Sequence, residues 1–285
     1  MNPPLALLDA WNLRLQGELG GRLNRHWQVR DRQERAVLRR WHAPEAEVRY
    51  ELDVLNLVSR THLNLPLLRR GPQAMDGALW SLHDFVPGNP APREDARRRG
   101  RWLADLQARW RDLPCPPPRP GWSDALDVLN DPVADALLDA QEIAHPSNVR
   151  LCRWHLHRAR TALAEVRPGP RPQTLIHGDF TPWNLRVQMD VWTGLLDFEF
   201  TRPADPMEDF ALAWRGVHDD VVRGYAEHSA LNDEDLALLT PLWWAHLLGA
   251  ALHDLERGIR DDGWSTRKLL VRSPLMGALA APYPG

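Results

Sequence analysis

One short segment of the chain carries residue types that could transfer a phosphoryl group. Asp179 and Asn184 are separated by four residues, and Asp197 follows within the apolar run 195–198. A carboxylate can orient or deprotonate an attacking hydroxyl. An amide and a second carboxylate supply the oxygen ligands that Mg²⁺ prefers, and nucleotide phosphates can complete the coordination of the metal. This order and spacing are typical of sites that transfer a phosphoryl group to a hydroxyl.

Each of these residues also has a simpler interpretation. Asp179 could cap an amide in a turn, Asn184 could satisfy backbone groups of a loop, and Asp197 could pair with an arginine. An unpaired carboxylate is costly to bury in an apolar strand, so Asp197 should face a cation or several donors. Glu199 lies two residues further on, which in a strand places it on the same face as Asp197. Glu199 could therefore be a second metal ligand or a surface carboxylate.

The composition predicts a globular chain with no strongly charged surface. The 285 residues suffice for two lobes, and the formal net charge of −3 does not favour nucleic acid or an anionic membrane as a partner. Positive charge is almost all arginine, because Lys268 is the only lysine. Cys115 and Cys152 have no metal-binding spacing, and the N-terminus lacks the basic flank of a secretory signal. We therefore expect reduced thiols and a cytoplasmic protein.

The N-terminal part of the chain predicts a small β-rich lobe. Residues 11–41 favour strands around a polar turn, and Gly20 and Gly21 offer a permissive loop before the hairpin. The apolar spacing over residues 45–57 is helical, whereas residues 79–86 alternate like a strand and end at a Pro-Gly turn signal. Strands, one helix and a further strand are therefore expected in this part.

The remainder of the chain is mostly helical by its pattern. Helices are expected over residues 93–111, 149–165, 206–228 and 233–260. The apolar stretch 236–252 comes nearest to a membrane span, but Pro241 and His246 interrupt it, so a buried helix pair is favoured. The sequence as a whole therefore predicts an α+β protein whose second part is the larger and more helical.

A run of arginines over residues 93–101 raises the possibility of a nucleic-acid surface. Glu94 and Asp95 interrupt the run, and no aromatic residue is interleaved before Trp102. Nucleic-acid surfaces normally combine clustered cations with stacking aromatics. The pattern instead predicts a solvated helix face.

The motifs resemble those of the aminoglycoside phosphotransferase and choline kinase-like family. The resemblance is carried by residues 177–184, residues 196–199, and Asp205-Pro206 with Asp209. Because this family has the bilobal protein-kinase fold, the resemblance implies a small β-rich N-terminal nucleotide-binding lobe over residues 1–86. It implies a larger, mostly helical C-terminal lobe over residues 87–285, which provides the catalytic and acceptor-binding residues.

The same resemblance implies roles for the motif residues. Asp179 would be the catalytic base, and Asn184 and Asp197 would be the magnesium ligands. His177 and Asp209 would brace the catalytic loop rather than react. An ordinary carboxylate suffices as the base, because loose phosphoryl-transfer transition states depend mainly on positioning.

A weaker resemblance extends into the N-terminal lobe. Residues 20–24, with Gly20 and Gly21, are similar to the nucleotide loop of the family, although they do not form a GxGxxG motif. Arg39 lies where many kinases place the phosphate-contacting lysine, and an arginine there keeps the charge with a different geometry. Glu51 would be its ion-pair partner. Alternatively, Arg39 would be a strand-edge charge and Glu51 part of a solvated helix face.

The nucleotide base would be recognised at a hinge. By position, residues 82–86 form this hinge, and Asp84 and Val86 would contact adenine through their backbone. Backbone contacts do not distinguish ATP from GTP, so we expect ATP with GTP left open. The oligomeric state cannot be read from the sequence.

The expected function is Mg²⁺-dependent transfer of the γ-phosphoryl group of ATP to a hydroxyl of a small molecule. The family builds its acceptor pocket from the helical lobe, so residues 211–260 should decide specificity. The acidic residues of this segment include Asp219, Asp220, Asp254 and Glu256. They would suit a cationic acceptor such as an amino sugar, an amino alcohol or a hydroxy amino acid, but exposed helix faces carry the same residues.

Two other classes of function stay open. A non-catalytic nucleotide-binding module would be compatible with the variant cation Arg39 and the short first loop. A metal-dependent hydrolase could use His177, Asp179, Asp197 and Asp209. Two-metal hydrolases usually recruit several histidines, and only one histidine lies in this cluster.

Overall fold

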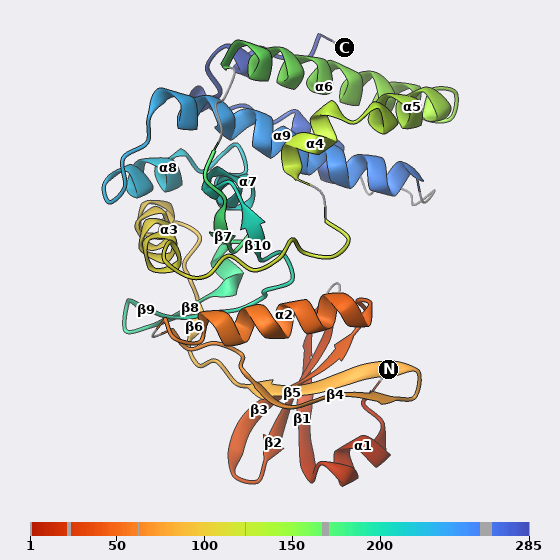
Figure 1. Ribbon diagram of the computed structural model, residues 1–285, viewed down its shortest axis with the longest axis vertical. Helices are drawn as coiled ribbons and strands as arrows, with labels where there is room; N and C mark the ends of the chain where they lie inside the picture. The colour runs from red at the N-terminus through yellow and green to blue at the C-terminus, as the bar shows by residue number, and fades with distance from the viewer. Residues whose placement is uncertain are drawn as a thin grey trace. The chain divides into compact units, whose positions relative to one another are not determined.

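The computed structural model describes residues 2–21, 24–61, 63–122, 124–166, 171–256 and 264–284 (Figure 1). The chain forms two compact units. Unit 1 comprises Met1–Ala91, Pro118–Gly121 and Pro182–Thr201, and unit 2 comprises Pro92–Pro117, Trp122–Thr181 and Arg202–Gly285. The units are therefore interleaved along the chain, whereas the lobes expected from the sequence, 1–86 and 87–285, are continuous. Arg22 and Leu23 of the expected nucleotide loop lie outside the described residues.

Unit 1 is built on a five-stranded antiparallel sheet with the strand order β1-β2-β3-β5-β4. The strands are β1 (Leu13–Gly20), β2 (Arg25–Asp31), β3 (Glu34–Trp41), β4 (Leu68–Met75) and β5 (Ala78–Asp84). Alternating apolar side chains of β2, β3 and β5 form a core with helix α1 (Leu5–Ala10). Trp27, Leu38 and Leu82 are fully buried there. The strands expected over residues 11–41 are therefore present as β1 to β3, and the hairpin expected across the polar turn at residues 30–35 is formed by β2 and β3.

Helix α2 (Glu45–Val58) lies beside this sheet in unit 1 (Figure 1). Glu45 and Glu47 occupy its first turn, where negative charge is favourable to the helix dipole. Its buried face carries Val48, Val54 and Leu55 together with one charged residue, Glu51. A buried carboxylate among apolar side chains requires a cation, and its partner on β3 is described below.

A second, three-stranded sheet completes unit 1 and carries two of the motif segments. Its order is β6-β8-β9, with β6 (Asn89–Pro90), β8 (Leu185–Gln188) and β9 (Val191–Leu195), and the short 3-10 helix η1 (Pro182–Asn184) precedes β8. The turn between β8 and β9 contains Met189 and Asp190, which both have positive φ. Such a two-residue turn matches the twist of a tight hairpin. The hairpin therefore holds the ends of β8 and β9 in fixed register.

Unit 2 is mostly helical. Its helices are α3 (Ala96–Trp110), α4 (Ala125–Asn130), α5 (Pro132–Gln141), α6 (Pro146–Val166), α7 (Asp209–Trp214), α8 (Asp219–Ala226), α9 (Asp233–Glu256) and α10 (Trp264–Leu269), with the 3-10 helices η2 (Pro206–Glu208) and η3 (Pro274–Ala280). Helix α6 packs against α9 (Figure 1). Strands β7 (Thr174–Ile176) and β10 (Arg202–Ala204) pair antiparallel. The expected α+β composition is therefore confirmed, with strands concentrated in unit 1 and helices in unit 2.

Helices α3 and α8 cross in close contact. A Cβ atom added at Gly100 would overlap the backbone oxygen of Val221, and one added at Gly224 would overlap that of Arg97. Two glycines thus let the backbones of the helices approach directly. This contact fixes α3 against α8 from Val221 to Tyr225.

Several expected helices differ in the structure. The single helix expected over residues 206–228 is wrong, because Arg215 and Gly216 have φ of 54° and 67° and end α7. Left-handed residues of this kind commonly terminate helices. The helices α1, α4 and α5 were not anticipated, since they are short and flanked by proline-rich or polar segments. Helix α9 spans Asp233–Glu256, and residues 257–260 of the expected helix lie outside the described part of the chain.

The arginine run also departs from its expected environment. The prediction of a solvated helix face is wrong for Arg99, which is 1% exposed. Arg99 lies four residues before Leu103 and therefore on the buried face of α3. Arg97 on the same helix is exposed, as expected.

Among the described helices, α9 alone is long and apolar enough to cross a membrane by length and composition. Its most apolar window has a mean hydropathy of 1.3, and 67% of that window is buried inside the protein. A buried core helix satisfies the same criteria. The packing of α9 against α6, α4 and α10 accounts for its apolar character.

Candidate active site

The expected base lies in a loop that follows strand β7 in unit 2. Ile176 pairs with Arg202 of β10, and the chain then leaves the sheet through His177 and Gly178 to Asp179. Gly178 has a φ of 78°, which a residue with a side chain adopts only at a cost. Asp179 is 9% exposed. The end of a short buried strand and one glycine therefore determine where this carboxylate lies.

Asp209 holds the backbone of this loop. The amide of Gly178 donates to Oδ1 of Asp209 at 2.7 Å, and Nε2 of Gln107 donates to Oδ2 at 2.9 Å. The hydroxyl of Tyr225 donates to Oε1 of Gln107 at 2.7 Å. Asp209 is fully buried at the start of α7. A chain of hydrogen bonds thus connects α8, α3 and α7 to the loop that carries Asp179.

Burial raises the pKa of Asp209 to about 6, although hydrogen bonds from Gln107 and Gly178 and the charge of Arg202 oppose this shift. Above this pH the carboxylate is ionised and accepts both hydrogen bonds. At neutral pH Asp209 is therefore mostly ionised and accepts from Gly178 and Gln107, and its role as a brace of the catalytic loop stays a prediction.

His177 contacts aromatic rings rather than solvent. Its ring lies 6.5 Å from that of Trp110 and 6.4 Å from that of Phe180, measured between centroids. The amide of Asp179 donates to Nδ1 of His177 at 3.3 Å. These contacts suit the structural support that was expected of His177.

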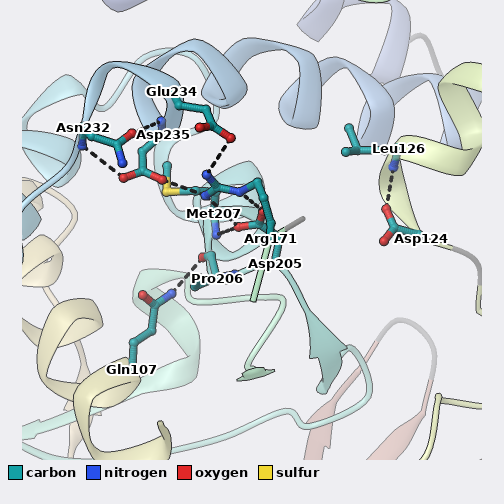
Figure 2. A network of polar contacts seen from close by, with 10 residues as sticks. All are labelled: Gln107, Asp124, Leu126, Arg171, Asp205, Pro206, Met207, Asn232, Glu234 and Asp235. Atoms are coloured by element: carbon teal, nitrogen blue, oxygen red, sulfur yellow. Dashed lines mark hydrogen bonds and ion pairs between the residues drawn. The ribbon is translucent and has the colours of Figure 1, made fainter. Parts of the chain in front are cut away.

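A second network fixes the segment that leads into Asp209 (Figure 2). Arg171 pairs with Asp205, with Asp235 at 2.6 Å and with Glu234 at 3.4 Å. Asp205 also accepts from the amide of Met207 at 2.9 Å and so caps η2. One guanidinium thus joins the first turn of α9 to the turn that precedes α7.

The two expected magnesium ligands lie in unit 1 at the end of the β8–β9 hairpin. The amide of Leu196 donates to the backbone oxygen of Asn184 at 2.8 Å, directly beyond the pairing of Leu185 with Leu195. Asn184 is 4% exposed, and Asp197 follows Leu196. The hairpin therefore brings an amide and a carboxylate, separated by twelve residues in sequence, onto adjacent strand ends. These oxygen donors fit Mg²⁺, which takes one or two protein ligands beside nucleotide phosphates.

The environment expected for Asp197 and Glu199 is wrong. Strand β9 ends at Leu195, and Asp197 has a φ of 65°, so the alternation of a strand does not extend to Glu199. Asp197 is half-buried rather than enclosed in an apolar strand. Glu199 instead accepts from Nδ2 of Asn24 at 2.9 Å and lies 3.8 Å from Nη2 of Arg39. Glu199 is therefore directed toward the first sheet.

Arg39 on β3 is surrounded by acidic and aromatic groups. It forms a two-point ion pair with Glu51, with nitrogen–oxygen distances of 2.5 and 3.2 Å. Its guanidinium carbon lies 3.5 Å from the centroid of the Trp41 ring. Arg39 and Glu51 are 6% and 2% exposed, so neither is the solvated surface charge of the alternative interpretation. The pair is therefore buried and held by two hydrogen bonds, and contact of Arg39 with a phosphate stays a prediction.

The glycines expected in the nucleotide loop have unusual backbone conformations. Gly20 and Gly21 have φ of 86° and 125°, and a Cβ atom at Gly21 would overlap the backbone oxygen of Asn24. Nδ1 of His26 lies 3.2 Å from the backbone oxygen of Gly20. Burial and the charge of Arg39 lower the pKa of His26 to about 4, so it is neutral at physiological pH. A residue with a side chain would be strained at Gly20 and Gly21, and at Gly21 its Cβ atom would also overlap Asn24.

The expected hinge residues make contacts within unit 1. The carboxylate of Asp84 accepts from Nε of Arg69 at 2.5 Å, and its amide donates to the backbone oxygen of Leu67 at 2.9 Å. Val86 is 5% exposed and lies against Gly194, where a Cβ atom would meet its side chain. The side chain of Asp84 therefore stabilises the sheet, and contact with adenine through the hinge backbone stays a prediction.

The acidic residues expected to favour a cationic acceptor are partly engaged within the protein. Asp219 accepts from Nε1 of Trp214 at 2.8 Å and from the hydroxyl of Ser273 at 2.5 Å. Asp220 pairs with Arg223 at 3.0 Å, three residues further along α8. These contacts favour a structural role for both carboxylates.

Sequence reasoning missed Gln107, Tyr225 and the contacts of Asn24. Gln107 lies on the face of α3 that also carries Leu103 and Leu106, and an uncharged polar residue on an apolar face is the signal that could have identified it. Its partner Asp209 lies 102 residues away in sequence, so the contact itself could not be predicted.

The sequence of this chain matches the model of one protein family. A model of the phosphotransferase enzyme family matches residues 17–242, about four fifths of the chain. No curated protein matches by sequence.

The structure is similar in fold to several solved structures. Aminoglycoside 2′-phosphotransferase-IIIa in complex with GDP superposes with a TM-score of 0.72 at 16% identity, over 96% of both chains. A ternary complex of a thermostable mutant of aminoglycoside phosphotransferase APH(4)-Ia with ADP and hygromycin B has a TM-score of 0.70 at 13% identity, over 98% of both chains. Plasmodium vivax ethanolamine kinase has a TM-score of 0.63 at 14% identity, over 95% of this chain and 82% of that chain. These likenesses confirm the kinase-like α+β fold.

Proposed function

We propose that this chain, which belongs to the phosphotransferase enzyme family, transfers the γ-phosphoryl group of ATP to a hydroxyl of a small molecule with the help of Mg²⁺. The observation that carries the proposal is the fixed backbone of the Asp179 loop, which Asp209 holds through the amide of Gly178. Phosphoryl transfer depends on positioning, and a rigid carboxylate is the group that it requires of the protein.

In the proposed reaction, Asp179 accepts the proton of the attacking hydroxyl or orients that hydroxyl. Asn184 and Asp197 are the residues that would hold a magnesium ion, through an amide and a carboxylate oxygen. When bound, the metal–nucleotide complex supplies the phosphoryl group and offsets the negative charge of its phosphates. His177 and Asp209 take no part in the chemistry and keep the loop in place.

Arg39 is the proposed phosphate-contacting cation. Glu51 fixes its guanidinium at two points, and Glu199 lies on the side of Nη2. Because the head group is already ordered by Glu51 and Trp41, little side-chain entropy is lost when a phosphate binds. The family relatives were solved with either GDP or ADP, so both nucleotides belong in the first binding experiments.

The acceptor is a small hydroxylated molecule. Similar structures contain amino-sugar antibiotics or belong to an ethanolamine kinase, which puts amino sugars, amino alcohols and hydroxy amino acids in the first panel. One scaffold hosts many acceptors, so the fold alone does not select among them.

The proposal is tested by ADP release with Mg²⁺ and ATP across that panel. We expect turnover with at least one acceptor and its loss in Asp179→Ala, while a thermal shift with Mg²⁺ and ATP persists in the variant. Asp139→Ala is the matched control, since Asp139 is an exposed carboxylate of α5 that pairs only with Arg153 among the described residues. Nucleotide binding without turnover of any acceptor would favour the non-catalytic module, and full activity of Asp179→Ala would refute the role of the base.

A further inference from the structure

One face of the five-stranded sheet carries a serine and a histidine that the proposed reaction does not use. Ser81 lies opposite Arg39 in the register of β5 and β3, and successive side chains of a strand point to opposite faces. Arg39 and Trp41 therefore share a face with Ser81 and His83, whereas the other face of these strands contributes to the apolar core. The polar side chains are thus collected on the face where Arg39 meets Glu51 of α2.

A chain of hydrogen bonds joins three of these side chains. Nε1 of Trp41 donates to Oγ of Ser81 at 2.7 Å. Oγ of Ser81 lies 2.7 Å from Nε2 of His83, and Nδ1 of His83 lies 2.8 Å from the backbone oxygen of Pro66. Trp41, Ser81 and His83 are all buried, so bulk water does not compete for these bonds.

The direction of each bond in the chain follows from its last acceptor. A carbonyl oxygen only accepts, so Nδ1 of His83 carries the hydrogen and donates to Pro66. Burial, followed by the charge of Arg39, lowers the pKa of His83 to about 3, so the ring is neutral and its Nε2 accepts from Ser81. The hydroxyl of Ser81 thus donates to His83 and accepts from Trp41. Because every polar hydrogen along the chain has an acceptor, the chain fixes the indole ring of Trp41.

This serine–histidine pair is unsuited to nucleophilic catalysis, although its spacing is that of a serine next to a base. Ser81 is fully buried, and its oxygen accepts from Trp41, so the hydroxyl cannot reach a substrate without breaking the chain. The pair therefore acts on the protein itself, through the indole.

The indole that the chain fixes is the surface on which Arg39 lies. The guanidinium carbon of Arg39 is 3.5 Å from the centroid of the Trp41 ring. Arginine stacks on aromatic faces, and the attraction of a cation is largest for tryptophan. Glu51 holds two nitrogens of the same guanidinium. Trp41 and Glu51 together therefore restrict Arg39 to one orientation, which the compact ammonium group of a lysine could not share.

We propose that Ser81 and His83 are positioning residues for nucleotide binding, because they hold Trp41 as the surface that orients Arg39 toward a phosphate. The inference rests on the proposed function, in which Arg39 is the phosphate-contacting cation. It gives the side chains of β5 a part in nucleotide affinity beside the backbone contacts expected of residues 82–86. A group that is ordered before binding loses less entropy when its ligand binds, so loss of the chain should weaken the nucleotide complex.

The first experiment measures the dissociation constant of ATP with Mg²⁺ by isothermal titration calorimetry. Ser81→Ala removes the middle of the chain, and Trp41→Phe keeps an aromatic ring but removes the N–H group. We expect the dissociation constant to rise about fivefold or more in both variants, because Arg39 is less well ordered. A folded Ser81→Ala with the affinity of the wild type would overturn the proposal.

Trp80→Phe is the matched control for Trp41→Phe. Trp80 is a buried indole on the opposite face of β5, and its Nε1 donates to the backbone oxygen of Met75 at 3.1 Å. The substitution likewise removes a buried N–H group, but its site is not in contact with Arg39 through the chain. The affinity for ATP should stay within about twofold of that of the wild type, as for an independent site. An equal loss of affinity in Trp80→Phe and Trp41→Phe would refute a specific role of the chain.

A double-mutant cycle separates the positioning of Arg39 from a general loss of stability. The background is Arg39→Met with Glu51→Leu, which removes the cation without leaving a buried carboxylate. In this background Ser81→Ala should change the dissociation constant of ATP by less than about twofold, although it still lowers the melting temperature. A further fivefold weakening in this background would show that Ser81 acts independently of Arg39 and would contradict the inference.

These titrations also distinguish the inference from the proposed function. The expected pattern of ATP affinities without phosphorylation of any acceptor would support the inference and contradict the proposed function. Unchanged affinity in Ser81→Ala together with normal turnover would contradict the inference alone. A wild-type protein that binds neither ATP nor GTP would contradict both.

Discussion

At the scale of single residues, Arg39 and Glu51 form a buried ion pair. Neither residue is more than 6% exposed, and two hydrogen bonds join the two side chains. Pairs of this kind often add little net stability compared with apolar residues, but removal of one partner leaves a buried charge. The pair therefore gives no strong argument from stability, and it is compatible with the proposed contact of Arg39 with a phosphate.

Replacement of Arg39 by methionine should separate the contribution of the ion pair to stability from its contribution to nucleotide binding. We expect Arg39→Met to lower the free energy of unfolding by about 3–5 kcal/mol, because Glu51 stays buried without its cation. The double variant Arg39→Met with Glu51→Leu should recover most of this loss in urea unfolding. Both variants should bind ATP at least tenfold more weakly in a thermal-shift titration. Recovery of nucleotide binding in the double variant would contradict the role assigned to Arg39.

Asp209 should affect the reaction through the loop that it holds. In Asp209→Asn, one carboxylate oxygen becomes an NH₂ group, which cannot accept from Gly178 or Gln107. A buried unsatisfied donor costs about 1–3 kcal/mol. We expect that loss of stability together with a fall in kcat, while the affinity for ATP stays unchanged. Asp139→Asn serves as the control, and an Asp209→Asn enzyme with normal kcat would show that the brace is dispensable.

The candidate residues of the site could be identified from the sequence because the motif that carries them is local, and their roles stay predictions. The motif around Asp179, Asn184 and Asp197 is contained in a short stretch of chain, and the order of its residues suffices to identify it. The direction of Glu199 could not be predicted, because the positive φ of Asp197 breaks the alternation on which the inference depended. Its partner Asn24 lies 175 residues away in sequence.

The crossing of α3 and α8 is the contact between elements that most constrains unit 2. It places the N-terminal half of α3 against α8 from Val221 to Tyr225, and it depends on two glycines without a Cβ atom. Glycine is otherwise unfavourable inside a helix by about 1 kcal/mol relative to alanine. Close backbone contact is therefore the reason that these glycines are present.

Gly100→Ala should destabilise the protein although alanine is the better helix former. The added methyl group would overlap the backbone of α8, and such overpacking costs about 1–3 kcal/mol or more. Gly249→Ala in α9 is the matched control, because the nearest atoms to its Cβ would be 3.8 Å away. Thermal melting should show a lower Tm for Gly100→Ala and an equal or higher Tm for Gly249→Ala. Stabilisation by both substitutions would contradict the close crossing.

Elements with strong periodicity could be predicted from the sequence, and others could not. Helix α2 and strands β2, β3 and β5 have clear apolar periods, and their bounds agree with expectation to within a few residues. The break after α7 depends on the left-handed conformation of Arg215, a residue type with no preference for that conformation. The burial of Arg99 was not predicted, because the residues around it in sequence, 93–101, are charged or small. The apolar periodicity of α3 becomes visible only from Trp102 onward.

The two units should respond differently to acid. In unit 1, burial and the charge of Arg39 lower the pKa values of His26 to about 4 and of His83 to about 3, from 6.5. Both histidines take up protons on unfolding below about pH 6.5, so stability is complete above that pH and is lost as the pH falls. In unit 2, burial lowers the pKa values of His155 and His246 to about 4.

Two carboxyls of unit 2 oppose its histidines. Burial raises the pKa of Glu208 to about 7 and that of Asp209 to about 6, so these groups bind protons in the folded state as the pH falls and stabilise it. We expect unit 1 to lose about 2.5 kcal/mol per pH unit near pH 5.5, and unit 2 to lose less. Hydrogen exchange of β2 and β3 amides, compared with those of α7 and α9 between pH 7 and 5, measures the difference. Equal loss of protection in both units would contradict it.

The whole molecule is proposed to join a nucleotide-holding unit to a unit that carries the base, and the identity of the phosphorylated product tests this most directly. ³¹P NMR of ATP, Mg²⁺ and an acceptor mixture should show ADP together with a new phosphomonoester resonance. In Asp179→Asn the resonance should appear at least a hundredfold more slowly, consistent with the size of general-base effects. Formation of ADP with inorganic phosphate alone, at equal rates in wild type and variant, would contradict a phosphotransferase that uses Asp179.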